Sequence, residues 1–214
     1  MLKTFQKSTK ITFGIIVLLA FLCEACLQNT GHENDAHIDT ISSLIEEGDI
    51  VFRRGEGMMS RIVLIGDVGG EYSHIGMVVS DEGNLKIAHA VPGEHDYEGD
   101  FDRVKLDALE TFFSKHHASR GAVVRLELNA EQKATLSHLA ITKANKKIEF
   151  DHNYNLTDTT KLYCTEFLQL VYSNIGINLN EGRKTTAFIP GMQGDYIMPS
   201  DIYKNKNLKK IYSF

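Results

Sequence analysis

The body of this chain lacks the second cysteine that an internal disulfide would need. The sequence has three cysteines in 214 residues, and two of them, Cys23 and Cys26, lie near the N-terminus. Cys164 is therefore alone in the rest of the chain. A single thiol leaves three interpretations: a small buried apolar side chain, a partner for another chain, or a nucleophile. Two histidines upstream of Cys164 favour the third interpretation.

The apolar run near the N-terminus is too short to cross a bilayer comfortably. It extends over the 13 residues from Ile11 to Cys23, whereas a membrane-spanning helix needs about 20 residues. Three lysines, Lys3, Lys7 and Lys10, precede it. A basic start followed by a short apolar run is typical of an export signal. We therefore expect residues 1–25 to be a signal peptide.

The pair Ala25-Cys26 resembles the cleavage site of bacterial lipoproteins, in which the cysteine becomes the lipidated N-terminus. Such sites usually have an aliphatic residue three positions before the cysteine and a small or aliphatic residue two before. Here Cys23 and Glu24 occupy those positions. We expect Cys26 to be lipidated, residues 26–43 to form a polar tether and residues 44–214 to form one domain. The expected location is the bacterial cell envelope, on the periplasmic side or at the outer membrane.

The sequence has no cluster of Lys and Arg of the kind that binds a phosphate backbone. The formal net charge is −5, and residues 1–25 contain three Lys and only one Glu, so the remainder is still more acidic. This balance argues against a nucleic-acid partner. The chain also contains no cofactor motif, and we expect no cofactor and no metal site.

Hydrophobic periodicity predicts strands in the middle of the domain with helices on either side, which is an α+β class with an antiparallel sheet. The predicted strands are 49–53, 73–80, 84–91, 122–128 and a last strand ending at 214. The predicted helices are 58–65, 107–117, 129–146, one from 158 or 160 to 174, and a short one from 200. Residues 92–104 are expected to be an acidic, solvated loop at the rim of a cleft. Residues 185–199 are expected to be irregular, and their aromatic and Met side chains either line a cleft or cover the core.

The strands 73–80 and 84–91 form a predicted hairpin that carries both histidines. If Val79 pairs with Asn84 across a four-residue loop, His74 lies opposite His89 on one face of the sheet. A slip of one residue would place the two histidines on different faces. The proposed register therefore predicts two adjacent imidazoles.

Cys164 lies in the first turn of a predicted helix. The unpaired N–H groups and the dipole at a helix start favour a thiolate over a thiol. A nearby imidazole completes the activation by taking the thiol proton. We therefore assign Cys164 as nucleophile, His74 as general base and His89 as the residue that orients His74, with the Cys164 N–H helping to hold an oxyanion.

Five segments in this order resemble the YiiX/YebB-like permuted papain-like hydrolases, a branch of the NlpC-type cysteine peptidase superfamily. They are Gly48–Arg53, Tyr72–Val78, Phe150–Asp151, Tyr163–Leu168 and Pro199–Ile202. The resemblance covers roughly residues 45–212. It implies a circularly permuted papain-like fold, with a central antiparallel sheet or partial barrel, flanking helices, and a histidine-bearing sheet that precedes the cysteine helix. The third polar residue of this family is often Glu, and His89 stands there in this chain.

The resemblance also implies hydrolysis of an amide through a Cys thioester, and substrates of the superfamily include peptidoglycan stem peptides and lipid-linked acyl groups. We predict a cell-envelope cysteine peptidase or amidase that acts on a peptide or lipid-conjugate substrate and contacts the membrane through its lipid anchor. Two alternatives remain: a lipid acyltransferase or lipid-amide hydrolase on the same fold, and a non-catalytic ligand-binding lipoprotein. We expect Glu166, two residues after the cysteine, to have a structural role.

Overall fold

The computed structural model describes residues 37–189 and 192–214. The chain divides into two compact units, Met1–Thr40 and Ile41–Phe214, and the second unit contains Cys164. The expected signal peptide, the lipidation site at Cys26 and most of the tether lie outside the described residues. Residues 37–44 form a helix, and Ile41 is completely buried. The compact unit therefore begins three residues before the predicted domain start.

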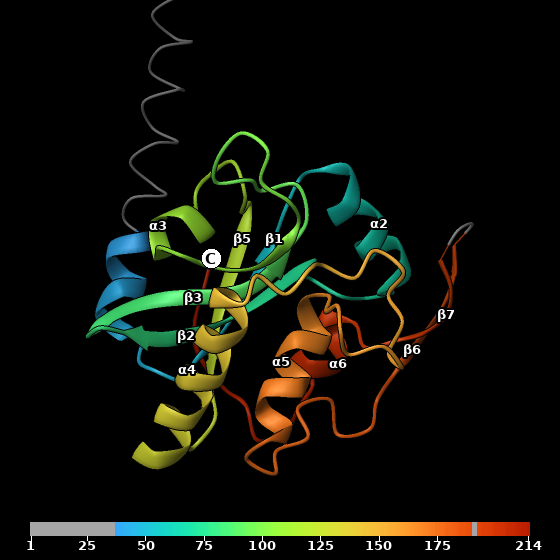
Figure 1. The fold of residues 1–214 in the computed structure, drawn as a ribbon. Helices are drawn as coiled ribbons and strands as arrows, with labels where there is room; N and C mark the ends of the chain where they lie inside the picture. Colours follow the sequence, from blue (N-terminus) through green and yellow to red (C-terminus); the bar gives the residue numbers. More distant parts are fainter. Residues whose placement is uncertain (1–36, 190–191) are drawn as a thin grey trace, which may run out of the picture. The chain divides into compact units, whose positions relative to one another are not determined.

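A six-stranded antiparallel sheet forms the centre of the described part of this unit (Figure 1), in the order β4-β3-β2-β1-β5-β8. Its strands are β1 (Ile50–Arg54), β2 (His74–Asp81), β3 (Asn84–Val91), β4 (Arg103–Asp107), β5 (Arg120–Arg125) and β8 (Lys209–Ser213). The helices are α2 (Met58–Gly66), α3 (Leu109–Phe112), α4 (Ala130–Asn145), α5 (Cys164–Ser173) and α6 (Pro199–Tyr203). The expected α+β fold with a central antiparallel sheet is confirmed.

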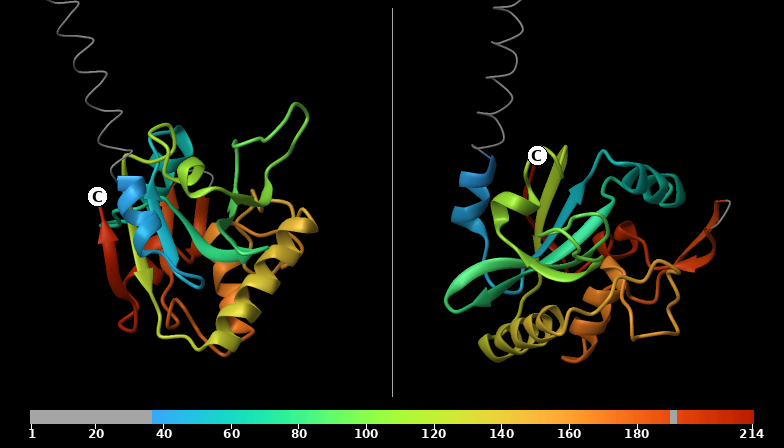
Figure 2. Two further views of the ribbon diagram at one scale, coloured as in Figure 1. Left: turned by 90° about the vertical axis from the view of Figure 1, so that its left-hand side faces the viewer. Right: turned by 45° about the horizontal axis from the view of Figure 1, so that its top comes forward.

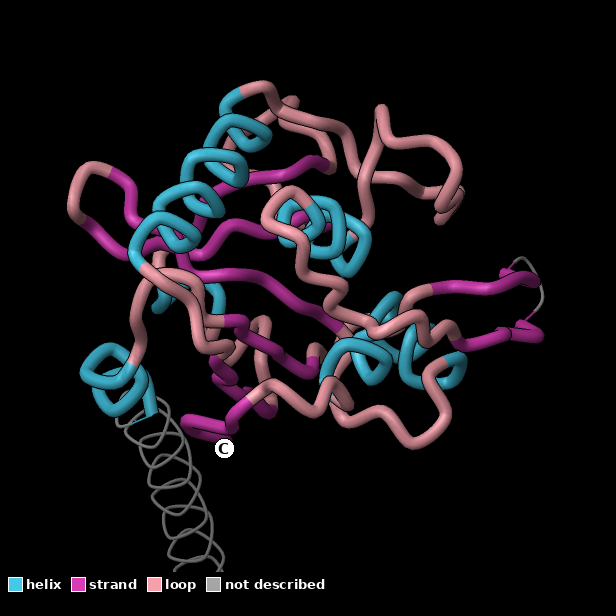
Figure 3. The backbone as a smooth tube through the Cα atoms, turned by 90° about the horizontal axis from the view of Figure 1, so that it is seen from below, coloured by secondary structure: helices cyan, strands magenta, loops and turns pink. Residues whose placement is uncertain are grey.

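Helices α4 and α5 cover one face of the sheet. They contact each other and pack on β2, β3 and β4, and Figure 3 shows them over these strands. Alternate residues of β2, including Ile75 and Met77, are fully buried in the same core as Leu136 of α4 and Phe167 of α5. Side chains of β2 with the opposite parity, including His74, point to the other face, where Phe112 of α3 packs on the His74 ring.

The β2–β3 hairpin is tighter than predicted. The strands pair Asp81 with Asn84 and Val79 with Lys86, so the expected pairing of Val79 with Asn84 is wrong by two residues. Both residues of the two-residue turn, Glu82 and Gly83, have positive φ angles of 51° and 84°, as in the tight turns that match strand twist. Because a shift of two residues preserves the alternation of side chains, His74 and His89 still share one face, as diagonal rather than directly opposed neighbours.

Strand β4 occupies the end of the predicted loop 92–104 and the residues up to Asp107, and helix α3 is the short remainder of the helix predicted over residues 107–117. The strand alternates charged and apolar residues, but its Arg103, Lys105 and Asp107 are buried, whereas the charged residues of such a pattern usually face solvent. Hydrogen bonds from other parts of the chain satisfy these charges. Helix α3 contains only four residues. The prediction of a long helix was therefore wrong in the segment that matters most for the site.

Two further predictions differ from the structure at loops near the cysteine. Helix α5 begins at Cys164 rather than at residue 158 or 160, because Asp151 and Asp158 accept hydrogen bonds from nearby backbone N–H groups and hold the preceding segment in turns. The predicted irregular stretch 185–199 contains a separate hairpin of β6 (Thr185–Ile189) and β7 (Met192–Tyr196). This hairpin extends from the sheet on the side of α2 (Figure 1 and Figure 2, right).

The remaining predicted elements agree with the structure within a few residues. Helix α4 begins with the expected capping box, in which Gln132 N donates to Asn129 Oδ1 at 2.8 Å and Asn129 N donates to Gln132 Oε1 at 3.0 Å. Local signals of this kind identified α2, α4, β2 and β3 from the sequence.

Candidate active site

Cys164 is the first residue of α5, and its side chain is half-buried. Phe167, Leu168 and Val171 on the same helix are fully buried and hold the helix start against the sheet. The backbone N–H groups of Thr165 and Ile75 lie near enough to the Cys164 sulfur to favour its thiolate form and lower its pKa. Because Ile75 follows His74 in β2, the thiol lies beside the strand that carries the predicted base.

The two predicted histidines lie together. His74 Nε2 is 2.8 Å from His89 Nδ1, and the exposed fractions of the two residues are 7% and 0%. The ring of Phe112 packs on both imidazoles, with centroid distances of 5.7 Å to His74 and 5.2 Å to His89. A Cβ atom on Gly76 would lie 3.2 Å from the Phe112 ring and 2.7 Å from Ile87 Cγ2, so the glycine permits this packing.

The hydrogen bonds continue beyond the predicted residues to β4. His89 Nε2 is 3.0 Å from Asp107 Oδ2, and Lys105 Nζ is 3.1 Å from Asp107 Oδ1. Both β4 side chains are buried. Neither residue was expected at the site, because the sequence pattern places Lys105 between a loop and a helix and Asp107 at the start of that helix. Their alternation in a strand that pairs His89 with Lys105 is the signal that could have identified them.

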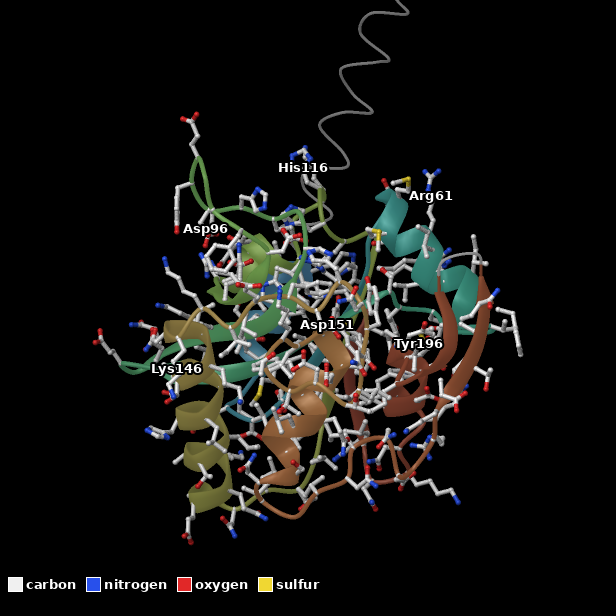
Figure 4. All side chains as sticks on the ribbon, turned by 45° about the vertical axis from the view of Figure 1, so that its right-hand side comes forward. Arg61, Asp96, His116, Lys146, Asp151 and Tyr196 are labelled. Carbon is white, nitrogen blue, oxygen red and sulfur yellow. The ribbon has the colours of Figure 1, made fainter. Side chains whose placement is uncertain are left out.

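Cys164 and His74 line the same cavity, which has a volume of about 340 Å³. One part of its lining is polar or charged and includes Arg53, Glu94, His116 and His117. Another part is apolar and consists of Met58, Met59, Val63, Val91, Pro92, Phe150 and Tyr154. In Figure 4, His116 lies at the same end of the domain as α2, the helix that carries Arg61. The site therefore offers both polar and apolar contacts to a substrate.

A small apolar recess reaches Cys164 from the side of the β6–β7 hairpin. Tyr196 and Met198 line it together with Val63 of α2 and Tyr154. Both residues are buried and pack against Ala187, whereas Phe188 is 83% exposed. Tyr196 and Met198 therefore fill both of the roles that the sequence left open, because they line the recess and cover the core, whereas the exposed Phe188 fills neither.

The pKa of the Cys164 thiol is about 11, because burial raises it more than the N–H groups of Thr165 and Ile75 and the charge of Arg53 lower it. The predicted stabilisation of a thiolate at the helix start is present, but the expected net direction was wrong. Burial, followed by the charge of Arg53, lowers the pKa of His74 well below its usual value. The resting site therefore contains a neutral thiol and a neutral imidazole.

The acidic loop between β3 and β4 is attached to the sheet by ion pairs with basic residues of β1 and β4, in addition to being solvated. This loop projects from the sheet in the left view of Figure 2. Its Glu94 pairs with Arg53, and its Asp96 lies 2.5 Å from Lys105 Nζ and 2.7 Å from Arg103 Nη2. These ion pairs connect the loop to the polar wall of the cavity and to the end of the His74–His89–Asp107 chain.

The comparison with family models decides the identity of the domain. Residues 44–212 match the model described as permuted papain-like amidase enzyme, YaeF/YiiX, C92 family. The chain belongs to this family. As a member of the C92 family it is a cysteine peptidase or amidase, with the permuted papain-like fold that the motifs implied.

A solved structure has the same fold as this C92 family member. It is described as the metalloprotein yiiX from Escherichia coli O157:H7, and it matches with a TM-score of 0.66 and 20% identity over 80% of this chain and 98% of that one. No curated protein sequence matches the chain significantly. Among residues 37–189 and 192–214 of the present chain, no group of three or more His, Cys, Asp or Glu side chains is placed to hold a metal ion. We derive no step through a metal.

Proposed function

We propose that this C92 family member is a cell-envelope cysteine hydrolase that cleaves an amide bond through a thioester on Cys164. The observation that carries the proposal is the arrangement around one cavity. Cys164 and His74 both line it, and the backbone N–H of Ile75, the residue after His74, lies near the sulfur. His74 serves as general base, and His89 orients it through the 2.8 Å contact between Nε2 and Nδ1.

The neutral resting state makes proton transfer part of the attack. His74 uses Nε2 for its contact with His89, so Nδ1 is the nitrogen that takes the thiol proton. As the proton leaves, the sulfur bonds to the substrate carbonyl carbon, and the oxyanion is held by N–H groups at the start of α5. The C–N bond then breaks and the leaving amine takes the proton from His74. In the second half, His74 takes a proton from water, the resulting hydroxide attacks the thioester, and the acid is released as the sulfur regains a proton.

The lining of the cavity supports a peptide or acyl-conjugate substrate. Arg53 and Glu94 offer charged contacts, and Met58, Met59 and Tyr154 offer apolar contacts. A peptidoglycan-type peptide would use the charged side chains for its polar groups. The scissile amide would lie at Cys164.

A lipid-amide hydrolase or acyltransferase is the second candidate, and an apolar surface beside the cavity favours it. Met58 and Met59 at the start of α2 are 76% and 38% exposed and also line the cavity. Val68 just after α2 and Phe188 on the neighbouring hairpin are 84% and 83% exposed. Exposed apolar side chains on α2 and on the hairpin that contacts it suit contact with an acyl chain.

We further propose that the protein is exported and anchored to the membrane through a lipid on Cys26. The proposal comes from the short apolar run after Lys3, Lys7 and Lys10 and from the pair Ala25-Cys26. Helices in the described residues are all too short or too polar to cross a bilayer. The proposed membrane partner therefore depends on the N-terminal segment, and we propose no nucleic-acid partner.

Turnover of defined substrates tests the proposed chemistry. We expect the purified protein to release a peptide from cell-wall fragments, or a fatty acid from lipid amides, with products identified by mass spectrometry. Cys164→Ala should abolish turnover without changing the circular dichroism spectrum, because it removes only the nucleophile. Full activity in this variant would refute the cysteine mechanism, and the class of product decides between the two candidates.

A further inference from the structure

The catalytic histidine stands at the end of a buried hydrogen-bond chain whose other end is fixed by charge. The chain passes from His74 Nε2 to His89 Nδ1 at 2.8 Å, and from His89 Nε2 to Asp107 Oδ2 at 3.0 Å. Lys105 Nζ closes it at 3.1 Å from Asp107 Oδ1. None of the four residues is more than 7% exposed, so water does not compete for these contacts.

The chemical nature of the last two residues determines the direction of every hydrogen bond. An ammonium group can only donate and an ionised carboxylate can only accept. Burial raises the pKa of Asp107, but hydrogen bonds from His89 and Lys105 outweigh it, so the net pKa is lowered and the carboxylate is ionised. His89 must then donate from Nε2. A neutral His89 has no proton left on Nδ1, and it must accept from His74 Nε2.

We propose that Asp107 and Lys105 are a positioning pair that sets the tautomer of His74 through His89, so that Nδ1 of His74 is bare and able to take the Cys164 proton. The pair touches neither the thiol nor the cavity. If these hydrogen bonds were donated in the opposite direction, Nδ1 of His74 would carry a proton and could not act as base. This inference rests on the proposed function and adds to it the residues that prepare the base.

The ammonium group of Lys105 is held in place by three acceptors. Besides Asp107 it donates to Asp96 Oδ1 at 2.5 Å and to the Glu94 carbonyl oxygen at 3.0 Å, so its three N–H groups are all engaged. It therefore always presents a donor to Oδ1 of residue 107. This constraint makes an isosteric substitution at Asp107 informative.

Asp107→Asn should reverse the donor and acceptor roles in every hydrogen bond between residue 107, His89 and His74. Because Lys105 must donate, the amide oxygen turns toward Lys105 and the amide NH₂ turns toward His89 Nε2. His89 then accepts at Nε2 and donates from Nδ1, and His74 accepts at Nε2 and holds its proton on Nδ1. A wrong tautomer of a catalytic histidine costs on the order of 10³- to 10⁴-fold in rate. We expect a loss on the order of 10²- to 10⁴-fold in the rate at which iodoacetamide alkylates Cys164 at pH 7.5, followed by peptide mass spectrometry on the full chain.

A double variant separates this effect from simple loss of structure. In Lys105→Met with Asp107→Asn, no ammonium holds the amide, which can turn its oxygen toward His89 and restore the original direction. We expect the double variant to alkylate at least 10-fold faster than Asp107→Asn alone, although it has lost one more buried contact. Lys105→Met alone keeps the carboxylate and serves as the matched control. A double variant that reacts no faster than Asp107→Asn would overturn the proposal.

Imidazole ¹⁵N chemical shifts test the same inference directly on the unmodified chain. His74 and His89 should both be Nε2–H tautomers in the wild-type protein and Nδ1–H tautomers in Asp107→Asn. A proton on Nδ1 of either histidine in the wild type would refute the proposal even if the variants failed to fold. The tautomers are independent of the proposed function, which would instead fail through undiminished turnover in Cys164→Ala.

Discussion

Burial and hydrogen bonding act in opposite directions on the Cys164 thiol, and burial prevails. The N–H groups of Thr165 and Ile75 favour the thiolate, but the pKa still rises to about 11. The pKa of His74 falls well below its usual value, chiefly through burial. A site of this kind depends on general base catalysis by His74 rather than on a preformed thiolate, and the pH profile of its reactivity should show this dependence.

We expect His74→Gln to change the shape of that profile. With a neutral His74 as base, the rate of alkylation of Cys164 by iodoacetamide should be nearly constant from about pH 7 to 9, because neither group titrates there. Without the base, only free thiolate reacts, so the rate should rise about tenfold per pH unit below the thiol pKa. At pH 7.5 the loss should be about 10²- to 10⁴-fold. His138→Gln, an exposed histidine of α4, is the control. A profile in His74→Gln as flat as in the wild type would contradict this prediction.

Glu166 is a buried carboxyl group whose charge is poorly compensated. Its Oε2 atom has no hydrogen-bond partner, and burial raises its pKa from 4.5 to about 7 even though the N–H of Tyr163 lowers it. The backbone N–H of Tyr163, at the start of α5, is the contact that favours its charged form, and the structural role expected for Glu166 stays a prediction. In the unfolded chain the carboxyl ionises near pH 4.5, whereas in the folded protein it ionises near pH 7. The protein is consequently destabilised as the pH rises between these two values.

Glu166→Gln should remove the loss of stability that ionisation of this carboxyl group causes. We expect the free energy of unfolding at pH 8 to rise by about 1–3 kcal/mol relative to the wild type, with almost no difference at pH 4.5, as measured by urea denaturation. Glu131→Gln, at an exposed position in the first turn of α4, should show no such pH dependence. A variant less stable than the wild type at pH 8 would mean that the ionised carboxylate contributes to the fold.

At the scale of secondary-structure elements, the tight β2–β3 hairpin and the close packing of α3 on it hold the two imidazoles together. Local signals predicted this hairpin well, because its strands alternate and its turn contains Gly83. They failed for β4, whose charged residues read as loop and helix. The difference is physical, since β2 and β3 are joined by their own tight turn, whereas β4 depends on backbone pairing with β3 and with Ile148, which lies more than 40 residues further along the sequence.

Gly76→Ala tests how closely these elements approach. Its new methyl group would lie 2.7 Å from Ile87 Cγ2 and 3.2 Å from Phe112 Cε2, so β3 and α3 must move. We expect a loss of about 1–3 kcal/mol in the free energy of unfolding, measured with urea, and slower alkylation of Cys164 as the packing on His74 loosens. Gly57→Ala is the control, because its φ is −65° and no atom lies within 4 Å of the added Cβ. Equal stability of the two variants would show that α3 adapts freely.

At the scale of the whole molecule, the site and the proposed anchor belong to different parts of the chain. The family match covers residues 44–212, and the compact unit that contains Cys164 begins at Ile41. The proposed lipidation site, Cys26, precedes both. Membrane attachment and thiol reactivity should therefore be separable by substitution.

Cys26→Ser should release the protein from the membrane fraction after expression in a bacterial host, because no lipid can be attached. The rate of alkylation of Cys164 should stay within about twofold of the wild type, since the substitution lies outside the compact unit. Cys23→Ser, three residues earlier, is the matched control and should remain membrane-bound. Membrane attachment of Cys26→Ser equal to that of Cys23→Ser would exclude the proposed anchor.

The sequence alone determined the class of the fold, the helix α4 with its Asn129 cap, the β2–β3 hairpin, and the family through an ordered set of motifs. These features depend on residues close together in the chain, or on their order along it. Only the tertiary structure decided the exact register of the hairpin, the buried chain from His89 to Asp107 and Lys105, and the acidity of Cys164. The last two depend on which residues surround a group in space, and the sequence near that group does not contain this information. The register follows from the two-residue turn at Glu82 and Gly83, which the sequence pattern did not distinguish from a longer loop. The isolated cysteine could thus be recognised from the sequence, but its neutral resting state could not.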